Sequence, residues 1–152
     1  QDGRLGLARQ FGATDVVDIR QHPTPEARVK EVLRLTDDWG GDVVLELVGN
    51  PAVMDEGIRM TAREGAYLEI GNINAGWKAE IDPAQLVFWN RRIIGLAHYE
   101  AEHLRDALDL MKRTLTKYPL GRVVSHKFPL DEINEAFVQQ DKGHITRAAI
   151  VP

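Results

Sequence analysis

Short apolar runs alternate with helical patterns along the chain as far as His98. Four runs predict buried strands: Val16–Ile19, Asp42–Val48, Ala66–Ile70 and Ile93–Ala97. A run that is apolar at nearly every position is typical of a strand buried on both faces, as in parallel sheets. Because helical patterns separate the runs, the order indicates repeated strand–helix units on one parallel sheet.

Capping signals mark where the predicted helices begin. Thr24, Pro25 and Glu26 form a strong helix start. Threonine can cap free amides, proline tolerates the first helical position, and an acid there faces the helix dipole favourably. The other predicted helices lie at about 2–11, 50–61, 83–89 and 100–114, and the last of these is strongly amphipathic.

The regular alternation stops near 98–100, which is the weakest boundary in the chain. Beyond it, a strand is predicted at Val123–Phe128, then a short helix capped by Asp131, then a final strand at Ala148–Val151. The pattern therefore divides the chain into an alternating part, 1–98, and a C-terminal segment, 99–152.

Composition narrows the classes of partner. The 152 residues carry 19 basic and 23 acidic side chains, a formal net charge of −4, with no basic cluster. Neither nucleic acid nor a membrane is an expected partner. There is no cysteine, which excludes disulfides and is compatible with a cytoplasmic location. The first residue is Gln1 rather than Met, which suggests a fragment, a processed product or a chain whose front is missing.

Candidate chemistry lies where strands end, because ligands of open α/β sheets bind beyond the carboxyl ends of the strands. Two predicted strands end in Gly-Asn, at Gly49-Asn50 and Gly71-Asn72. Glycine lets a flat ligand approach the backbone, and the amide can hydrogen-bond it. The same pair could equally serve only to turn the chain.

Other polar residues leave alternatives open. None of the five histidines has a partner at metal-ligand spacing, so no metal site is expected. Glu46 is an acid inside an apolar strand, and it could be functional, face a polar crevice or pair with a base. Arg147 follows a glycine turn and precedes the final strand. Its guanidinium could grip a phosphate bidentately or make a surface salt bridge.

Six segments, taken in order and spacing, resemble the zinc-containing medium-chain alcohol dehydrogenases. They are ARQFGATDVVD (8–18), WGGDVVLELVGNP (39–51), GAYLEIGN (65–72), NRRIIGLAHY (90–99), FPLDEINEAF (128–137) and GHITRAAIVP (143–152). The resemblance implies a partial Rossmann-type, doubly wound parallel sheet that binds NAD or NADP, at 1–98. It also implies that 99–152 returns to a catalytic domain.

The resemblance also implies a set of cofactor-binding residues. Arg4 falls at the basic position near the adenosine ribose, and Arg147 at the tail arginine that pairs with the pyrophosphate. The strand-end residues expected to line the cofactor crevice are Leu47, Val48, Gly49, Ile70, Gly71, Asn72, Leu96, Ala97 and His98. Within this set, 70–72 and 96–98 fall on segments that reach the nicotinamide amide.

The family's phosphate loop, ribose-reading acid and zinc ligands would all lie upstream of Gln1. No catalytic or metal-binding residue is therefore expected in this chain, which by itself should be inactive and poorly stable. The parent enzyme would use zinc and oxidise a small alcohol or reduce a carbonyl, as a homo-oligomer joined near Val87–Ile94. The alternatives are a zinc-free relative of the quinone reductase type and a non-catalytic dinucleotide-binding or interaction module.

Overall fold

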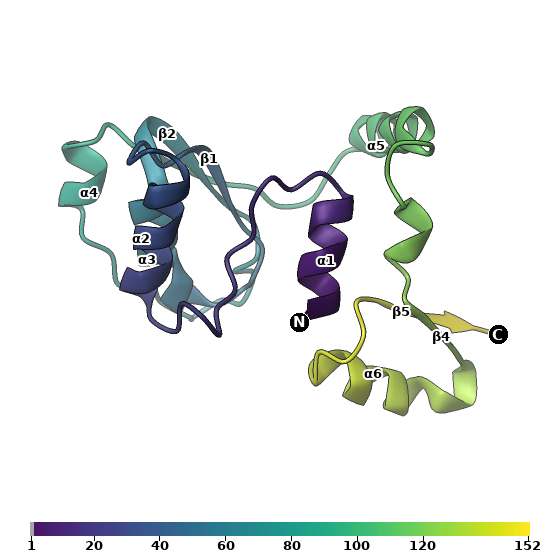
Figure 1. Ribbon diagram of the computed structural model, residues 1–152. Helices are drawn as coiled ribbons and strands as arrows, with labels where there is room; N and C mark the ends of the chain where they lie inside the picture. Colours follow the sequence, from purple (N-terminus) through teal and green to yellow (C-terminus); the bar gives the residue numbers. More distant parts are fainter. Residues whose placement is uncertain (1) are drawn as a thin grey trace. The chain divides into compact units, whose positions relative to one another are not determined.

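The computed structural model describes residues 2–152, which form two compact units (Figure 1). One unit is Val17–His98, and the other joins the residues up to Val16 with Tyr99–Pro152. The first helix is therefore grouped with the C-terminal part of the chain. The division into a cofactor domain, 1–98, and a C-terminal segment, 99–152, stays a prediction.

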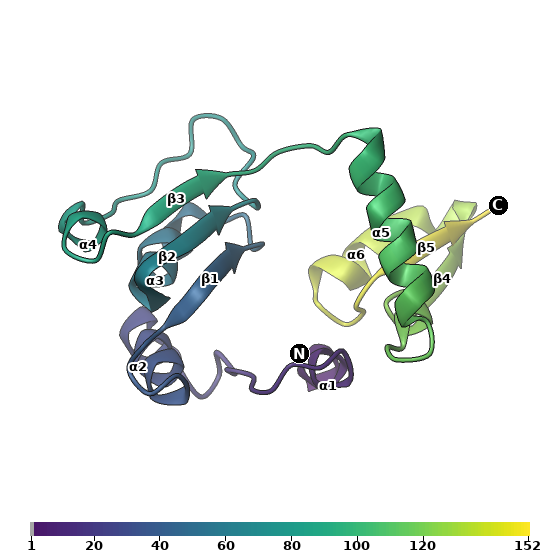
Figure 2. The same cartoon turned by 90° about the horizontal axis from the view of Figure 1, so that it is seen from above.

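A three-stranded parallel sheet forms the centre of the Val17–His98 unit. Its strands are β1 (Gly41–Glu46), β2 (Thr61–Glu69) and β3 (Arg92–Gly95), in the order β1-β2-β3 (Figure 2). In the register, Tyr67 of β2 pairs with Val44 on one side and with Ile93 on the other. The predicted α/β class with a parallel sheet is confirmed.

Helices α2 (Pro25–Leu35) and α3 (Met54–Met60) pack together, and α3 contacts β1 and β2. As predicted, Thr24 caps α2, because its hydroxyl oxygen accepts a hydrogen bond from the Ala27 amide at 3.2 Å. Arg28 of α2 and Glu56 of α3 form a two-pronged ion pair, with Nη2 to Oε2 at 2.6 Å and Nε to Oε2 at 3.0 Å. The pair fixes how the two helices lie against each other.

Two further elements complete this unit. The 3-10 turn η1 (Pro51–Val53) leads into α3, and α4 (Ala84–Val87) precedes β3. The Asn50 side chain caps η1 by accepting a hydrogen bond from the Ala52 amide at 3.0 Å. Asn50 thus caps the start of the helical segment that the sequence predicts at about 50–61.

The two faces of the sheet differ in burial. Tyr67 is 1% exposed, and its ring packs over Gly57 of α3. On the opposite face, Val43 and Leu45 of β1 remain 55% and 54% exposed, and Ile94 of β3 remains 40% exposed. An exposed apolar strip of this kind is uncommon on the surface of a monomeric soluble protein. Within residues 2–152 only one face of the sheet is covered.

One predicted strand is wrong: Val16–Ile19 forms no strand and pairs with none of the strands among the described residues. A turn at Asp18 competes for the backbone groups, because the amides of Gln21 and His22 both donate to the Asp18 carbonyl oxygen. Hydrogen bonds from Arg20 also hold the pKa of the Asp18 carboxyl at about 2. Apolar residues alone do not make a strand where no ladder is available.

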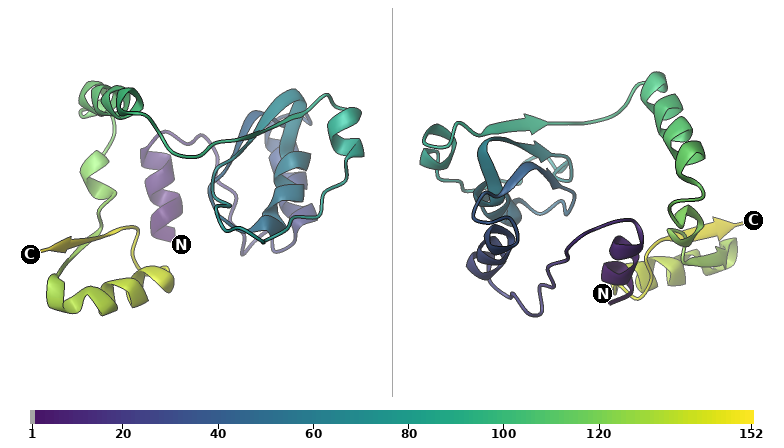
Figure 3. Two further views of the ribbon diagram at one scale, coloured as in Figure 1. Left: turned by 180° about the vertical axis from the view of Figure 1, so that it is seen from behind. Right: turned by 45° about the horizontal axis from the view of Figure 1, so that its top comes forward.

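The other unit contains three helices and a two-stranded parallel ribbon. Its elements are α1 (Asp2–Gln10), α5 (Ala101–Thr114), η2 (Leu120–Arg122), β4 (His126–Pro129), η3 (Leu130–Glu132), α6 (Ile133–Asp141) and β5 (Ala148–Val151). Helix α6 connects the two paired strands and packs on both (Figure 3). Asp131 does not cap α6 as predicted, because it lies inside η3 and the helix begins after Glu132.

Helix α5 confirms the predicted amphipathic helix, but the side chains of its apolar face are about half exposed to solvent. Leu104, Leu108 and Met111 are 49%, 57% and 46% exposed. In the part of the chain that the structure describes, no helix is both long enough and apolar enough to cross a membrane.

The contact between Gly57 and Tyr67 leads to a test of the packing in the Val17–His98 unit. A methyl group at Gly57 would lie 2.4 Å from the Tyr67 ring, so Gly57→Ala should lower the free energy of unfolding by about 1–3 kcal/mol. Gly6→Ala is the matched control, since Gly6 is also helical and has nothing within 4 Å of its added methyl group. It should leave stability unchanged or raise it by roughly 0.5–1 kcal/mol. Urea unfolding followed by circular dichroism measures both, and equal effects would contradict the packing described here.

Candidate functional site

Three loops follow the carboxyl ends of the three parallel strands and so emerge at one edge of the sheet. They begin at Leu47 after β1, at Ile70 after β2 and at Leu96 after β3. The Leu96 amide still donates to the Glu69 carbonyl oxygen at 3.0 Å, which holds the third loop beside the second. This edge is where open α/β sheets bind ligands.

A single carboxylate connects the first two loops. Glu46, the last residue of β1, is only 4% exposed. Its Oε1 accepts hydrogen bonds from the amides of Val48 at 2.6 Å and Gly49 at 2.7 Å, and its Oε2 accepts one from the Gly71 amide at 2.9 Å. Of the possibilities that the sequence left open for Glu46, the structure shows pairing with backbone amides rather than with a base.

The side chain of Asn72 extends this network to a second carboxylate. Its Nδ2 donates to Glu69 Oε1 at 2.9 Å and lies 3.4 Å from Glu46 Oε2. Asn72 Oδ1 and Glu69 Oε2 are buried and have no hydrogen-bond partner among the described residues. The amide donor of Asn72 is therefore used inside the protein, and only its oxygen remains without a partner.

Burial and hydrogen bonding oppose each other at these acids. Burial raises the pKa of Glu46, but hydrogen bonds from the amides of Gly49, Val48 and Gly71 favour the charged form, and the pKa lies below its ordinary value. Burial also raises the pKa of the Tyr67 hydroxyl, with the charges of Glu69 and Glu46 adding to the effect. Glu46 is thus a carboxylate and Tyr67 a neutral phenol at neutral pH.

Both glycines of the strand ends are required by close contact between the loops. Gly49 has φ of 74°, and a methyl group added there would lie 2.8 Å from the Gly71 carbonyl oxygen. A methyl group at Gly71 would lie 2.5 Å from both Gly49 N and Glu46 Oε2. The sequence offered two reasons for these glycines, close approach of a ligand and a simple turn of the chain. The structure adds a third reason, which is the direct contact between the two loops.

The strand-end residues singled out from sequence lie at this edge. Leu47 and Val48 are 68% and 73% exposed, and Leu96 is 47% exposed. Ala97 is exposed as well, and His98 is exposed with a left-handed φ of 62°, a conformation that histidine tolerates better than most residues. Ile70 and Gly71 are half-buried. The three loops together form an apolar, glycine-containing surface, and its contact with a cofactor stays a prediction.

The two predicted arginines lie in the other unit. Arg4 is engaged, because its Nη2 donates to the Ile145 carbonyl oxygen at 2.9 Å. Arg147 is exposed, and no ion pair or side-chain hydrogen bond of its guanidinium is recorded within residues 2–152. The surface salt bridge considered as its alternative is therefore not seen in the described part of the chain.

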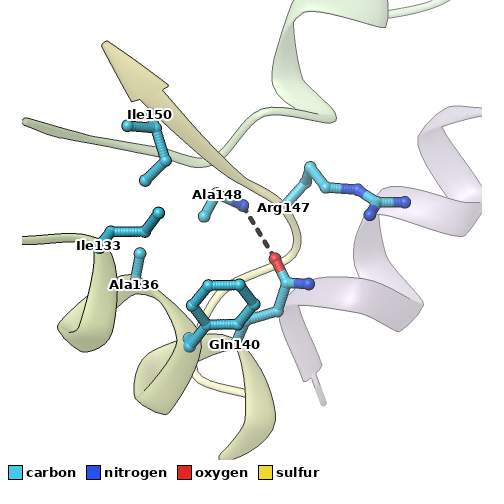
Figure 4. A pocket seen from close by; sticks show the side chains of 7 residues that line it. Ile133, Ala136, Gln140, Arg147, Ala148 and Ile150 are labelled. Atoms are coloured by element: carbon cyan, nitrogen blue, oxygen red, sulfur yellow. Dashed lines mark hydrogen bonds between the residues drawn. The ribbon is translucent and has the colours of Figure 1, made fainter. Parts of the chain in front are cut away.

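The surroundings of Arg147 leave its charge available. It borders a small pocket of about 200 Å³ lined mainly by apolar residues of α6 and β5, with its guanidinium directed away from them (Figure 4). The nearby backbone is fixed, since Gln140 Oε1 accepts the Ala148 amide at 3.1 Å and Ser125 Oγ accepts the Thr146 amide at 2.9 Å. Arg147 thus presents a guanidinium without an ion-pair partner among residues 2–152, directly before β5.

Sequence reasoning missed Glu69 as a member of the site. Glu69 lies at the register position of Glu46 on the neighbouring strand, so aligning the carboxyl ends of the two predicted strands would have found it. Among the described residues, no group of three or more His, Asp or Glu side chains is placed to hold a metal ion.

A parallel sheet with helices between its strands and glycine turns after two of them defines the α/β class of protein. Comparison with known families agrees. The model of the zinc-binding dehydrogenases matches residues 1–113, which is most of the chain. The chain belongs to this family, that of the zinc-containing medium-chain alcohol dehydrogenases, and the resemblance stated from sequence is confirmed.

Two curated relatives illustrate the similarity. The chain is 34% identical over 151 residues to S-(hydroxymethyl)glutathione dehydrogenase of Haemophilus influenzae, covering 97% of this chain and 38% of the relative. It is 29% identical over 147 residues to 5-exo-hydroxycamphor dehydrogenase of Pseudomonas putida, covering 97% of this chain and 40% of the relative. The chain thus spans well under half the length of these relatives.

Solved structures share the fold. An alcohol dehydrogenase zinc-binding domain protein from Burkholderia ambifaria superposes with a TM-score of 0.84 at 27% identity, covering all of this chain and 40% of the other. An alcohol dehydrogenase from Thermotoga maritima gives a TM-score of 0.86 at 24% identity, covering all of this chain and 41% of the other. The partial Rossmann-type fold is confirmed.

The contact between Gly49 and Gly71 can be separated from the conformational demand of the turn. Gly49 and Gly76 both have positive φ, but an added methyl group at Gly76 would have nothing within 4 Å. Gly76→Ala should therefore lower the free energy of unfolding only by the cost of placing alanine in a left-handed backbone conformation, about 1–2 kcal/mol. Gly49→Ala should cost about 1–3 kcal/mol more, because its methyl group meets the Gly71 carbonyl. Urea titration followed by tryptophan fluorescence compares the two, and equal losses would rule out the contact as the reason for Gly49.

Proposed function

We propose that this chain forms part of the nicotinamide-dinucleotide site of an NAD(P)-dependent alcohol dehydrogenase. The observation that carries the proposal is the gathering of three strand-end loops at one edge of a parallel sheet, in a chain that belongs to the zinc-binding dehydrogenases. The residues proposed to line the cofactor in this unit are Leu47, Val48, Gly49, Ile70, Gly71, Asn72, Leu96, Ala97 and His98.

The chemistry of the loops supports a nicotinamide ring and its carboxamide. Exposed Leu47, Val48 and Leu96 offer apolar surface for a flat ring. The amides of Val48, Gly49 and Gly71 are already bound to Glu46, so these three residues can offer a ligand only their carbonyl oxygens. Carbonyl oxygens are the acceptors that the NH2 group of a carboxamide needs.

Once bound, the nicotinamide supplies a carbon that accepts a hydride from an alcohol or returns one to a carbonyl. The part of this chain in that chemistry is to hold the ring in one orientation and to keep water from its inner face. Arg147 would pair with the pyrophosphate and Arg4 would lie near the adenosine ribose. The unpaired guanidinium of Arg147 supports the first role, and the bond from Arg4 to Ile145 leaves less of its guanidinium for the second.

The substrate is proposed to be a small alcohol or carbonyl compound, as the names of the relatives suggest. Zinc is proposed as the second cofactor of the whole enzyme, held by residues outside this chain, and no step is assigned to it here. A cytoplasmic location is proposed on the absence of cysteine. Homo-oligomer formation through Val87–Ile94 is supported by β3, an edge strand of the described sheet, and by Val87 and Phe88, which are 73% and 76% exposed.

A zinc-free oxidoreductase of the quinone reductase type would use the same edge of the sheet in the same way. The names of the relatives, both of them alcohol-type dehydrogenases, favour the first function. A non-catalytic dinucleotide-binding module would bind the cofactor tightly without turnover, so an assay of alcohol oxidation separates it.

Arg147 gives the test of cofactor binding. In the protein expressed from its complete gene, Arg147→Ala should raise the Kd for NADH or NADPH roughly 10- to 150-fold, because it removes hydrogen bonds to a charged group worth about 1.5–3 kcal/mol. Arg105→Ala is the matched control, since Arg105 is also exposed and lies on α5. Titration of the nicotinamide fluorescence measures both affinities. An unchanged affinity in Arg147→Ala would remove Arg147 from the site, and no binding by the unaltered protein would refute the proposed function.

A further inference from the structure

We propose that Glu46 is a positioning residue for the cofactor: its carboxylate ties loop 47–49 to loop 70–72 and so sets the separation of the two surfaces that bind the nicotinamide half. The inference rests on the proposed function and adds a residue that does not itself need to touch the cofactor.

The two carboxylate oxygens of Glu46 bind different loops. Oε1 receives both of its amide hydrogen bonds from the loop after β1, and Oε2 receives its amide hydrogen bond from the loop after β2. A residue that only closed a turn would bind its own loop alone. Glu46 instead joins segments that are 25 positions apart in sequence, between Glu46 and Gly71.

The contacts leave little freedom between the loops. The Gly71 amide donates to both the Glu46 carbonyl oxygen at 3.1 Å and Glu46 Oε2 at 2.9 Å, so one residue holds Gly71 with its backbone and its side chain. Gly49 and Gly71 already approach so closely that a methyl group fits at neither. A shift of either loop would therefore break a charge-assisted hydrogen bond or open a gap beneath the exposed Leu47 and Val48.

Only a glutamate satisfies this geometry. Glutamine has one acceptor oxygen, and its NH2 group would meet amide donors of one of the two loops. Aspartate keeps the charge but is one methylene shorter, so it can reach one loop but not both at the same distances. Asn72 reinforces the tie, because its amide group bridges Glu46 and Glu69.

The test uses the complete protein and compares two probes of the site. Glu46→Gln should raise the Kd for NADH about 10- to 100-fold, because a small misplacement of binding groups has effects of this size. The Kd for ADP-ribose, which lacks the nicotinamide, should rise by much less. A merely structural role would lower both affinities together through partial unfolding. Glu80→Gln is the control, since it makes the same change at an exposed residue of the same unit.

Glu46→Asp keeps the test decisive if Glu46→Gln does not fold. It should show an intermediate loss of NADH affinity and the same preference for ADP-ribose. Wild-type affinity for NADH in Glu46→Asp or Glu46→Gln, or equal losses for NADH and ADP-ribose, would overturn the positioning role while leaving the proposed function intact. Failure of the unaltered protein to bind either NADH or NADPH would overturn both.

Discussion

The buried carboxylate of Glu46 is the interaction on which this edge of the sheet depends. A charge removed from water is costly unless hydrogen-bond donors replace the water, and here three backbone amides do so. Those amides belong to residues just past the ends of β1 and β2, so the carboxylate binds both loops directly after the strands. The same demand brings the two loops so close that both contact positions must be glycine.

Exposed apolar residues form two strips, one in each unit. Val43, Leu45 and Ile94 form a strip on the side of the sheet opposite α3, and Leu104, Leu108 and Met111 form another on α5. Apolar area left in water forfeits the main driving force of folding. The packed core lies on the other side of the sheet, where Tyr67 and Ile58 are almost fully buried. The covered side of the sheet therefore supplies most of the stability of the Val17–His98 unit.

Sequence patterns predicted the elements better than their connections. Continuous apolar runs located β1, β2 and β3, and Thr24 marked the start of α2, because these signals are local. The run at Val16–Ile19 misled, since a strand also requires a partner, and a turn at Asp18 takes its backbone groups. Glu46 was visible as an acid in a strand, but its partners lie in two loops and could not be read from spacing. Asp131 failed as a cap because a 3-10 turn comes before α6.

The two units differ in how their residues are distributed along the chain. Val17–His98 is one uninterrupted stretch, whereas the other unit needs both the residues up to Val16 and Tyr99–Pro152. Helix α1 contacts residues far along the chain, since Arg4 donates to the Ile145 carbonyl oxygen and Gln10 accepts a hydrogen bond from Arg122, so on a ribosome these contacts form only after the C-terminal segment has been made. The sheet unit can fold before that point, because all of its residues lie in one continuous stretch that is synthesised earlier. Synthesis therefore imposes an order, with the Glu46 network formed before the segment that carries Arg147 has left the ribosome.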